Sequence, residues 1–285
     1  MKEKKLLWII FFNVLIIVSE ILFGFLSNSF ALIADALHNT GDVLALVITY
    51  IALKAAQKKK NFRFTFGYLR AEMMAAFTNT LFLFLTMFYM IYEAILRLYN
   101  PQTIEAEYMV IVGGIALIAN GVSAYLLREM ELSSHHHGDA NIYSAYLHML
   151  SDALISFSVV VAGILIYYFQ IYSIDAVLTI VFSLYILFHS YPLLKKSFLS
   201  LMDANTHLDD QDQLKKIIKA DERVISYHDI HIYSPSSKDN FISFHIVLED
   251  ESITLKESSH LLQNLKKRLK EKGFTHILIQ VETSP

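Results

Sequence analysis

The sequence predicts an all-α membrane protein with a bundle of six transmembrane helices, followed by a small cytoplasmic α+β domain. Its mean hydropathy of +0.42 and its 54% of hydrophobic residues are too high for an ordinary soluble chain of 285 residues. Long apolar runs fill the chain as far as Leu201, whereas Met202 to Pro285 mixes charged residues with short alternating patterns. We therefore expect a transmembrane domain at 1–201 and a cytoplasmic domain at 202–285.

Six stretches are long enough to cross a bilayer, whose apolar core of about 30 Å requires about 20 helical residues. They are Leu6 to Leu26, Phe30 to Leu53, Met73 to Leu98, Tyr108 to Leu127, Ile142 to Tyr168 and Ile174 to Leu194. The first stretch follows lysines, as a signal peptide would. It is longer than a typical apolar signal core and has no clear small-residue cleavage site, so we interpret it as a helix.

Basic residues collect in alternate loops, which predicts the orientation of the helices. They lie before the first span, between the second and third, after the fourth and after the sixth, as Lys2, Lys4, Lys5, Lys54, Lys58, Lys59, Lys60, Arg63, Arg70, Arg128, Lys195 and Lys196. The opposite loops are nearly free of them. Both termini are therefore expected in the cytoplasm. We expect the plasma membrane as the location, although the residues also allow an internal membrane.

Composition excludes several classes of function. The chain has no cysteine, which rules out disulfides, thiolate metal sites and cysteine nucleophiles. The net charge of −3 and the absence of a nucleic-acid-binding motif argue against a nucleic-acid partner. Metal chemistry in this chain must therefore use histidine and carboxylate side chains.

Ionisable side chains recur as two H-x-x-x-D pairs inside the expected spans, where such groups usually mark an ion site. The second span contains His38 and Asp42, and the fifth contains His148 and Asp152. A spacing of four residues places both side chains of a pair on one helix face. At 1.5 Å per residue, His38 lies about 12 Å from the outer end of its span near Phe30, and His148 lies about 12 Å from the cytoplasmic start of its helix near Ala140. Antiparallel helices would therefore bring the four side chains together near the middle of the bilayer.

Two imidazoles and two carboxylates form a four-coordinate set that suits tetrahedral Zn²⁺. Mg²⁺ and Ca²⁺ favour more oxygen ligands, and Mn²⁺ is less favoured than zinc. The same ligand set is compatible with Cd²⁺ and Co²⁺ as alternative substrates. The competing interpretation is that these side chains make hydrogen bonds between packed helices, which a lone intramembrane histidine often does.

Other polar residues carry weaker signals. Asp35 lies one turn before His38, where it could line a pathway or orient a ligand, and Asn13 and Glu20 could belong to a pathway or to helix packing. His189, near the end of the sixth span, is expected to be interfacial or structural. The run His135 to His137 could bind metal weakly before the fifth span, or could be an ordinary solvated loop.

The whole chain resembles the cation diffusion facilitator family of zinc and related metal exporters. The resemblance rests on S-N-S-F-A-L-I-A-D-A-L-H-N-T-G-D (27–42), R-F-T-F-G-Y-L-R-A-E (63–72), H-M-L-S-D-A-L (148–154), I-D-A-V-L (174–178) and H-D-I-H-I-Y (228–233). It implies a transport site at His38, Asp42, His148 and Asp152, a homodimer, proton-coupled antiport, and export of metal from the cytoplasm. Histidine, rather than aspartate, at position 38 resembles the pattern of the zinc-selective branch of the family, which favours zinc over manganese or iron as the substrate.

The chain departs from some family members in the loop between the second and third spans. That loop reads K-K-K-N-F-R-F-T-F-G-Y and contains neither histidine nor aspartate. We therefore predict no metal site there.

The C-terminal part has an α-β-β-α-β pattern, with helical periodicity at 209–219 and 254–270 and strands at 224–233, 240–248 and 276–281. Antiparallel strands place alternate residues on one face, so His228, His245, Gln280 and Glu282 could converge on one site, with His260 on the second helix nearby. The segment resembles the ferredoxin-like cytoplasmic domain of the family, which implies metal ligands at His228, His245, His260 and Glu282. Gln280 replaces a histidine of the family pattern, which puts a binuclear site in doubt. His231 and His276 could substitute for it, or could be strand residues without a ligand role.

An intramembrane metal hydrolase and a membrane metal sensor are the two other classes of function that this sequence brings into question. An intramembrane metal hydrolase would need an open coordination position and a general base, but no histidine is followed by glutamate, so H-E-x-x-H is absent. We expect no enzyme activity and no catalytic cofactor. A membrane metal sensor without transport is the alternative, and metal flux across a sealed membrane distinguishes the two.

Overall fold

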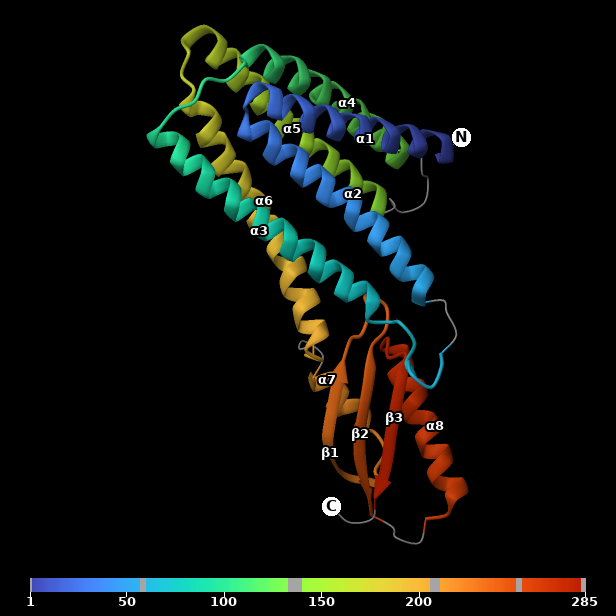
Figure 1. Cartoon of the computed structure of the whole chain (residues 1–285). Helices are drawn as coiled ribbons and strands as arrows, with labels where there is room; N and C mark the ends of the chain where they lie inside the picture. The colour runs from blue at the N-terminus through green and yellow to red at the C-terminus, as the bar shows by residue number, and fades with distance from the viewer. Residues whose placement is uncertain (1, 57–59, 133–139, 206–210, 250–252, 283–285) are drawn as a thin grey trace. The chain divides into compact units, whose positions relative to one another are not determined.

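The computed structural model describes residues 2–56, 60–132, 140–205, 211–249 and 253–282 (Figure 1). Within these ranges six long helices precede a small α/β segment. The long helices are α1 (Lys2–Ser27), α2 (Phe30–Ala56), α3 (Ala71–Tyr99), α4 (Ala106–Leu132), α5 (Ala140–Phe169) and α6 (Ser173–Leu201). They are followed by α7 (Gln211–Ile218), β1 (Val224–Tyr233), β2 (Phe241–Leu248), α8 (Leu255–Glu271) and β3 (His276–Glu282).

The chain divides into two compact units. One combines residues 1–44 with 80–191, and the other combines residues 45–79 with 192–285. The first unit contains most of the apolar helical sequence, and the second contains the sheet.

Within the described residues, four helical segments are long and apolar enough to cross a membrane: Ala71–Tyr99, Ala106–Glu129, Tyr146–Phe169 and Ser173–Leu201. In α1, the segment Val14–Ser27 is a shorter apolar helix. The sixth helix extends beyond the expected end at Leu194, as far as Leu201, and contains Pro192. These segments establish a helical integral membrane domain.

The connection between α1 and α2 is short and tightly hydrogen-bonded. Asn28 adopts a left-handed conformation with φ of +58°, and Ser29 N–H donates to Gly24 O at 3.1 Å. A Cβ atom at Gly24 would lie only 2.8 Å from Ile33, so the absence of a side chain allows the two helices to approach. Ser29 Oγ accepts from Leu32 N–H at 3.2 Å and so caps α2.

The α6 residue Asp175 completes this cap from a distant part of the sequence. Its carboxylate accepts from Ser29 Oγ at 2.5 Å, from Phe30 N–H at 2.9 Å and from Ala31 N–H at 3.2 Å. Amide groups at the start of a helix have no partner within the helix, so this carboxylate satisfies donors that would otherwise be unpaired in an apolar region. The N-terminal ends of α2 and α6 are thereby held together.

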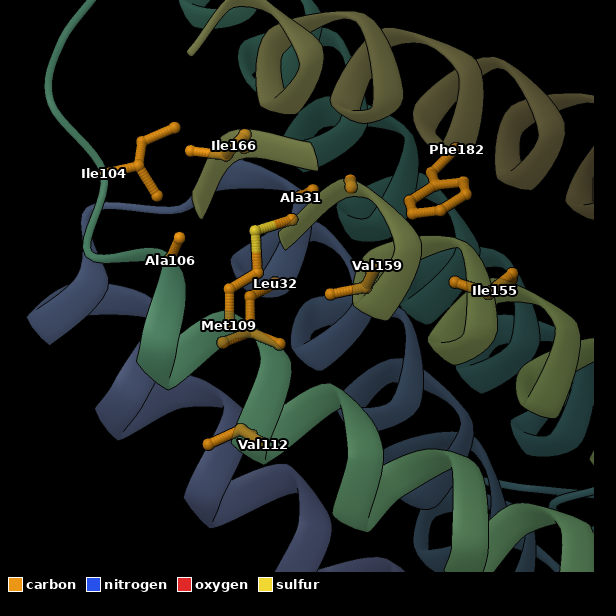
Figure 2. Packing of buried hydrophobic residues seen from close by; sticks show 11 residues of the cluster. Ala31, Leu32, Ile104, Ala106, Met109, Val112, Ile155, Val159, Ile166 and Phe182 are labelled. Atoms are coloured by element: carbon orange, nitrogen blue, oxygen red, sulfur yellow. The ribbon is translucent and has the colours of Figure 1, made fainter. Parts of the chain in front are cut away.

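The core of the helical unit is formed by aliphatic side chains from several helices (Figure 2). Met109 on α4 and Val159 on α5 are completely buried within it. Helices α4 and α5 approach closely at Gly163, where a Cβ atom would lie 2.7 Å from Val110 Cγ2. Small residues at such contacts are typical of packed membrane helices.

The three strands form one sheet in the order β1-β2-β3 (Figure 1). Strand β1 pairs with β2 in antiparallel fashion, and β3 pairs with β2 in parallel. The parallel pairing follows from the crossover through α8, since a direct hairpin can join only antiparallel strands. The observed elements match the α-β-β-α-β order expected from the sequence.

Helix α8 has two features that its sequence encodes, a capping box at its start and a stripe of leucines along one face. Thr254 and Glu257 form a capping box at its start, in which the Thr254 side chain accepts from Glu257 N–H and the Glu257 side chain accepts from Thr254 N–H. Leu261, Leu265 and Leu269 recur every four residues and are buried in the core that α8 shares with the sheet. The helix therefore packs through a single apolar stripe.

Candidate metal centre

The two H-x-x-x-D pairs lie next to each other in the helical unit. On α2, His38 Nε2 lies 3.6 Å from Asp42 Oδ2, and on α5, His148 Nε2 lies 3.6 Å from Asp152 Oδ2. Both pairs have the one-turn spacing expected from the sequence. Each helix thus presents one imidazole and one carboxylate on the same face.

Contacts between α2 and α5 join the pairs into one group. His148 Nε2 lies 3.1 Å from Asp42 Oδ2, and His38 Nε2 lies 4.0 Å from Asp152 Oδ1. Each histidine therefore touches both aspartates, and we call these four residues the quartet. With zinc bonds of about 2.0–2.1 Å, ligand atoms of a tetrahedral site lie about 3.4 Å apart. The four histidine–aspartate contacts lie at 3.1 to 4.0 Å, but among the described residues only a group in the sheet has three ligand atoms that all lie within 4.8 Å of one another.

Burial differs between the members of the quartet. The side chains of His38 and Asp152 are 9% and 3% exposed, whereas those of His148 and Asp42 are 39% and 38% exposed. Asp152 Oδ1 is buried and receives no hydrogen bond from the described residues. A buried carboxylate oxygen without a donor is costly unless a cation or proton occupies the position in front of it.

A second polar group lies beside the quartet, between α1 and α2. Glu20 is completely buried and Asp35 is 2% exposed. The Asn39 amide donates to Glu20 Oε2 at 3.1 Å and to Asp35 Oδ1 at 3.4 Å, so it joins the two carboxyl groups. Asp35 and Glu20 thus meet each other in the bundle, while the side chain of Asn13 lies outside the described part.

A cavity of about 290 Å³ opens against the quartet. Its wall includes His38, His148 and Asp152, and on the opposite side Tyr185, Ile186 and His189 from α6. The sequence interpretation of His189 as interfacial or structural did not anticipate this position. No local pattern signals it, because α6 reaches the quartet only through tertiary packing.

In the cytoplasmic sheet, strand register places His228 opposite His245, and His245 beside Gln280. Glu282 Oε2 lies 3.2 Å from His228 Nε2, and Glu282 Oε1 lies 2.8 Å from His245 Nδ1. One ligand atom from each of His228, His245 and Glu282 lies within 4.8 Å of the others. This set, the sheet triad, is small enough to surround one metal ion.

Nearby residues take different positions around the sheet triad. Gln280 Nε2 donates to Glu282 Oε1 at 3.0 Å, so its amide fills the place of an imidazole next to the carboxylate. Asp229, in a left-handed conformation at a β-bulge, places Oδ2 3.7 Å from His245 Nε2 and Oδ1 2.9 Å from His231 Nε2. The sequence analysis did not identify Asp229, because a bulge interrupts the alternation of a strand.

The other expected ligands lie outside the sheet triad. His260 is exposed on α8, with its Nδ1 atom 3.4 Å from Asn264 Nδ2. His276 packs against the ring of Phe241. The run His135 to His137 lies outside the described residues.

Comparison with known proteins decides the family. Residues 6–202 match the cation efflux transmembrane domain, and residues 207–284 match the cation efflux protein cytoplasmic domain. This chain belongs to the cation diffusion facilitator family. The family consists of metal cation efflux transporters, which agrees with the helical membrane domain and the separate small sheet.

Similar proteins among characterised cation diffusion facilitators carry names that describe metal efflux. The cadmium, cobalt and zinc/H(+)-K(+) antiporter of Bacillus subtilis is 35% identical over 282 residues, which cover 99% of this chain and 89% of that protein. The metal cation efflux system protein CzcD of Cupriavidus metallidurans is 33% identical, covering 94% and 83%. The zinc transporter ZitB of Pectobacterium atrosepticum is 33% identical, covering 98% and 85%.

Proposed function

We propose that this cation diffusion facilitator exports Zn²⁺ from the cytoplasm in exchange for protons, with the quartet as its transport site. The contact that carries the proposal is His148 Nε2 to Asp42 Oδ2 at 3.1 Å, which joins α2 to α5. Cd²⁺ and Co²⁺ are further candidate substrates, because imidazole and carboxylate ligands also accept them. The similar proteins named for cadmium, cobalt and zinc support the same range.

The proposed architecture places six spans in the plasma membrane, with both termini in the cytoplasm. The transmembrane transport domain comprises residues 1–201, and the cytoplasmic domain comprises residues 202–285. The α7-β1-β2-α8-β3 order, with β3 parallel to β2, supports a ferredoxin-like fold for the second domain. That domain is proposed to mediate homodimerisation and to bind zinc at the sheet triad, with His260 as a more distant ligand candidate.

Transport is proposed to proceed by alternating access of the quartet to the two sides of the membrane. A cytoplasmic metal ion displaces protons from the imidazoles of His38 and His148, because a nitrogen can bind either a proton or the metal. After the helices rearrange, protons from the opposite side compete with the ion and release it. Imidazole suits this exchange because it changes charge near neutral pH.

Flux of Zn²⁺ into sealed vesicles containing the full chain tests the transport site. With an imposed pH gradient, the wild-type protein should accumulate zinc, and Asp152→Ala should abolish accumulation because it removes a buried ligand. Ser156→Ala, one turn further along α5, is the matched control, since it deletes another buried polar atom without touching the quartet. Wild-type flux in Asp152→Ala would reject the quartet as the transport site.

Measurements on the same vesicles distinguish a transporter from a sensor and test whether zinc transport is coupled to protons. A sensor would bind zinc without accumulating it inside the vesicle. If protons are exchanged, abolishing the pH gradient should reduce zinc accumulation, and zinc flux should change the internal pH. Zinc accumulation that does not depend on the pH gradient would contradict proton coupling.

A further inference from the structure

The cavity beside the quartet contains one imidazole that the transport site does not use. His189 lies on α6, whereas the quartet comes from α2 and α5. His189 lines the same cavity as His38, His148 and Asp152, and is close enough to interact electrostatically with Asp42 and Asp152. A cation in this cavity would therefore meet an additional nitrogen ligand besides His38, His148 and Asp152.

The ring of His189 is held in a defined orientation. It stacks on Tyr185, one helical turn away, with 5.9 Å between ring centroids and 15° between ring planes. An exposed imidazole on a membrane helix is unfavourable against lipid, but a cavity lined by charged groups provides it with a polar environment. Stacking and the cavity together favour a functional position for His189 over a lipid-facing one.

The cavity extends from the quartet toward one end of the bundle. On α5 its lining residues run from Asp152 back to Leu147, toward the N-terminal end of that helix, and on α6 they lie near the middle, from Tyr185 to His189. In the proposed orientation the N-terminal end of α5 faces the cytoplasm. The cavity is thus on the side from which an exported ion arrives.

We propose that His189 is a loading ligand, which binds the divalent metal ion in this cavity before the ion passes to the quartet. This inference rests on the proposed transport function and adds a residue to it. The additional nitrogen would lower the metal concentration needed to fill the site from the cytoplasm, while release from the quartet would not depend on it.

Zinc flux kinetics test the loading role. In vesicles with zinc supplied at the cytoplasmic face, His189→Asn should raise KM for Zn²⁺ about tenfold, the range for losing an interaction that supports metal binding, and should leave kcat within about twofold. Phe188→Ala is the matched control, because Phe188 is the adjacent α6 residue, is 84% exposed and does not line the cavity. A KM unchanged from wild type in His189→Asn would overturn the proposal.

The absence of cysteine from the chain permits a second test that does not depend on flux. His189→Cys introduces a single thiol, which a water-soluble maleimide should label in the purified full-length protein. Saturating Zn²⁺ should slow this labelling at least tenfold, whereas labelling of Lys267→Cys, at an exposed position on α8, should be insensitive to zinc. Equal labelling of His189→Cys with and without zinc would also overturn the loading role.

The two sets of measurements distinguish failure of this inference from failure of the proposed function. If wild-type protein transports zinc and Asp152→Ala does not, while His189→Asn behaves as wild type, then only the loading role is wrong. If the wild-type protein fails to transport zinc, the proposed transport function fails, and thiol protection still reports whether the metal reaches position 189.

Discussion

The Nε2 atom of His148 on α5 lies 3.1 Å from Oδ2 of Asp42 on α2. Asp42 also lies 3.6 Å from His38, so its carboxylate stands between the two imidazoles. Asp42 thus joins the two halves of the quartet. Its loss should affect both histidines at once.

Asp42→Asn should reduce zinc flux at least about 100-fold, because the substitution keeps the shape of the side chain but removes its negative charge and one ligand oxygen. Initial rates in vesicles measure the effect. Thr40→Val is the control, since the Thr40 hydroxyl donates to Ala36 O of its own helix at 2.7 Å. Flux within a few-fold of wild type in Asp42→Asn would show that this carboxylate is not a ligand.

Gln280→His should strengthen metal binding by the sheet triad about tenfold or more, because it adds an imidazole beside Glu282. His228→Ala should weaken it by about 10–100-fold. Both variants are best measured by zinc titration of the full chain carrying Asp152→Ala, which removes the contribution of the quartet. Equal affinities in the two variants would argue against a metal site on the sheet.

Acidification should weaken zinc binding at the sheet triad, because protons compete with the metal for the nitrogens of His228 and His245. In the Asp152→Ala protein, zinc should be released progressively as the pH is lowered from 7.5 to about 5.5. Restoring the pH after removal of the metal with a chelator, and then adding zinc, should restore binding. Affinity independent of pH would exclude the imidazoles as ligands.

Gly163→Ala should lower the free energy of unfolding by about 1–3 kcal/mol, because the new methyl group would overlap Val110 where α4 and α5 meet. Denaturant titration of the detergent-solubilised protein measures the change. Gly114→Ala on α4 is the matched control, since its Cβ atom would meet nothing within 4 Å. Similar stability of the two variants would contradict the close approach at Gly163.

Ser29→Ala should destabilise the protein by about 1 kcal/mol, the typical cost of losing a helix N-cap. Asp175→Asn should cost more, because three donors near the start of α2 lose a charged acceptor. Thermal unfolding in detergent can rank the two variants. A milder effect of Asp175→Asn than of Ser29→Ala would mean that the carboxylate contributes little to the cap.

Local periodicity explains which parts of this molecule could be predicted from its sequence. His38 and Asp42, like His148 and Asp152, are related by one helical turn, so each pair was evident without a structure. The neighbouring positions of His228, His245 and Gln280 on the sheet could be predicted from the alternation of side chains along the expected strands. The helix-strand order of the C-terminal domain followed from the same periodicities.

Features that depend on distant contacts could not be predicted in this way. His189 reaches the cavity, and Asp175 reaches the start of α2, only because α6 packs against other helices. Asp229 approaches His245 because a bulge changes the direction of side chains along β1. The sixth helix was expected to end near Leu194, yet α6 continues to Leu201.

The carboxylate of Asp175 also restricts how the bundle can change shape. Separating the first turns of α2 and α6 would leave the Phe30 and Ala31 amides without these acceptors, and a buried amide that loses its acceptor costs about 1–3 kcal/mol. These two ends should therefore travel as one body during a transport cycle. If the quartet carries the ion as proposed, the motion that uncovers it would come from bending further along α2 or α6, or from movement of the other helices relative to these two joined ends.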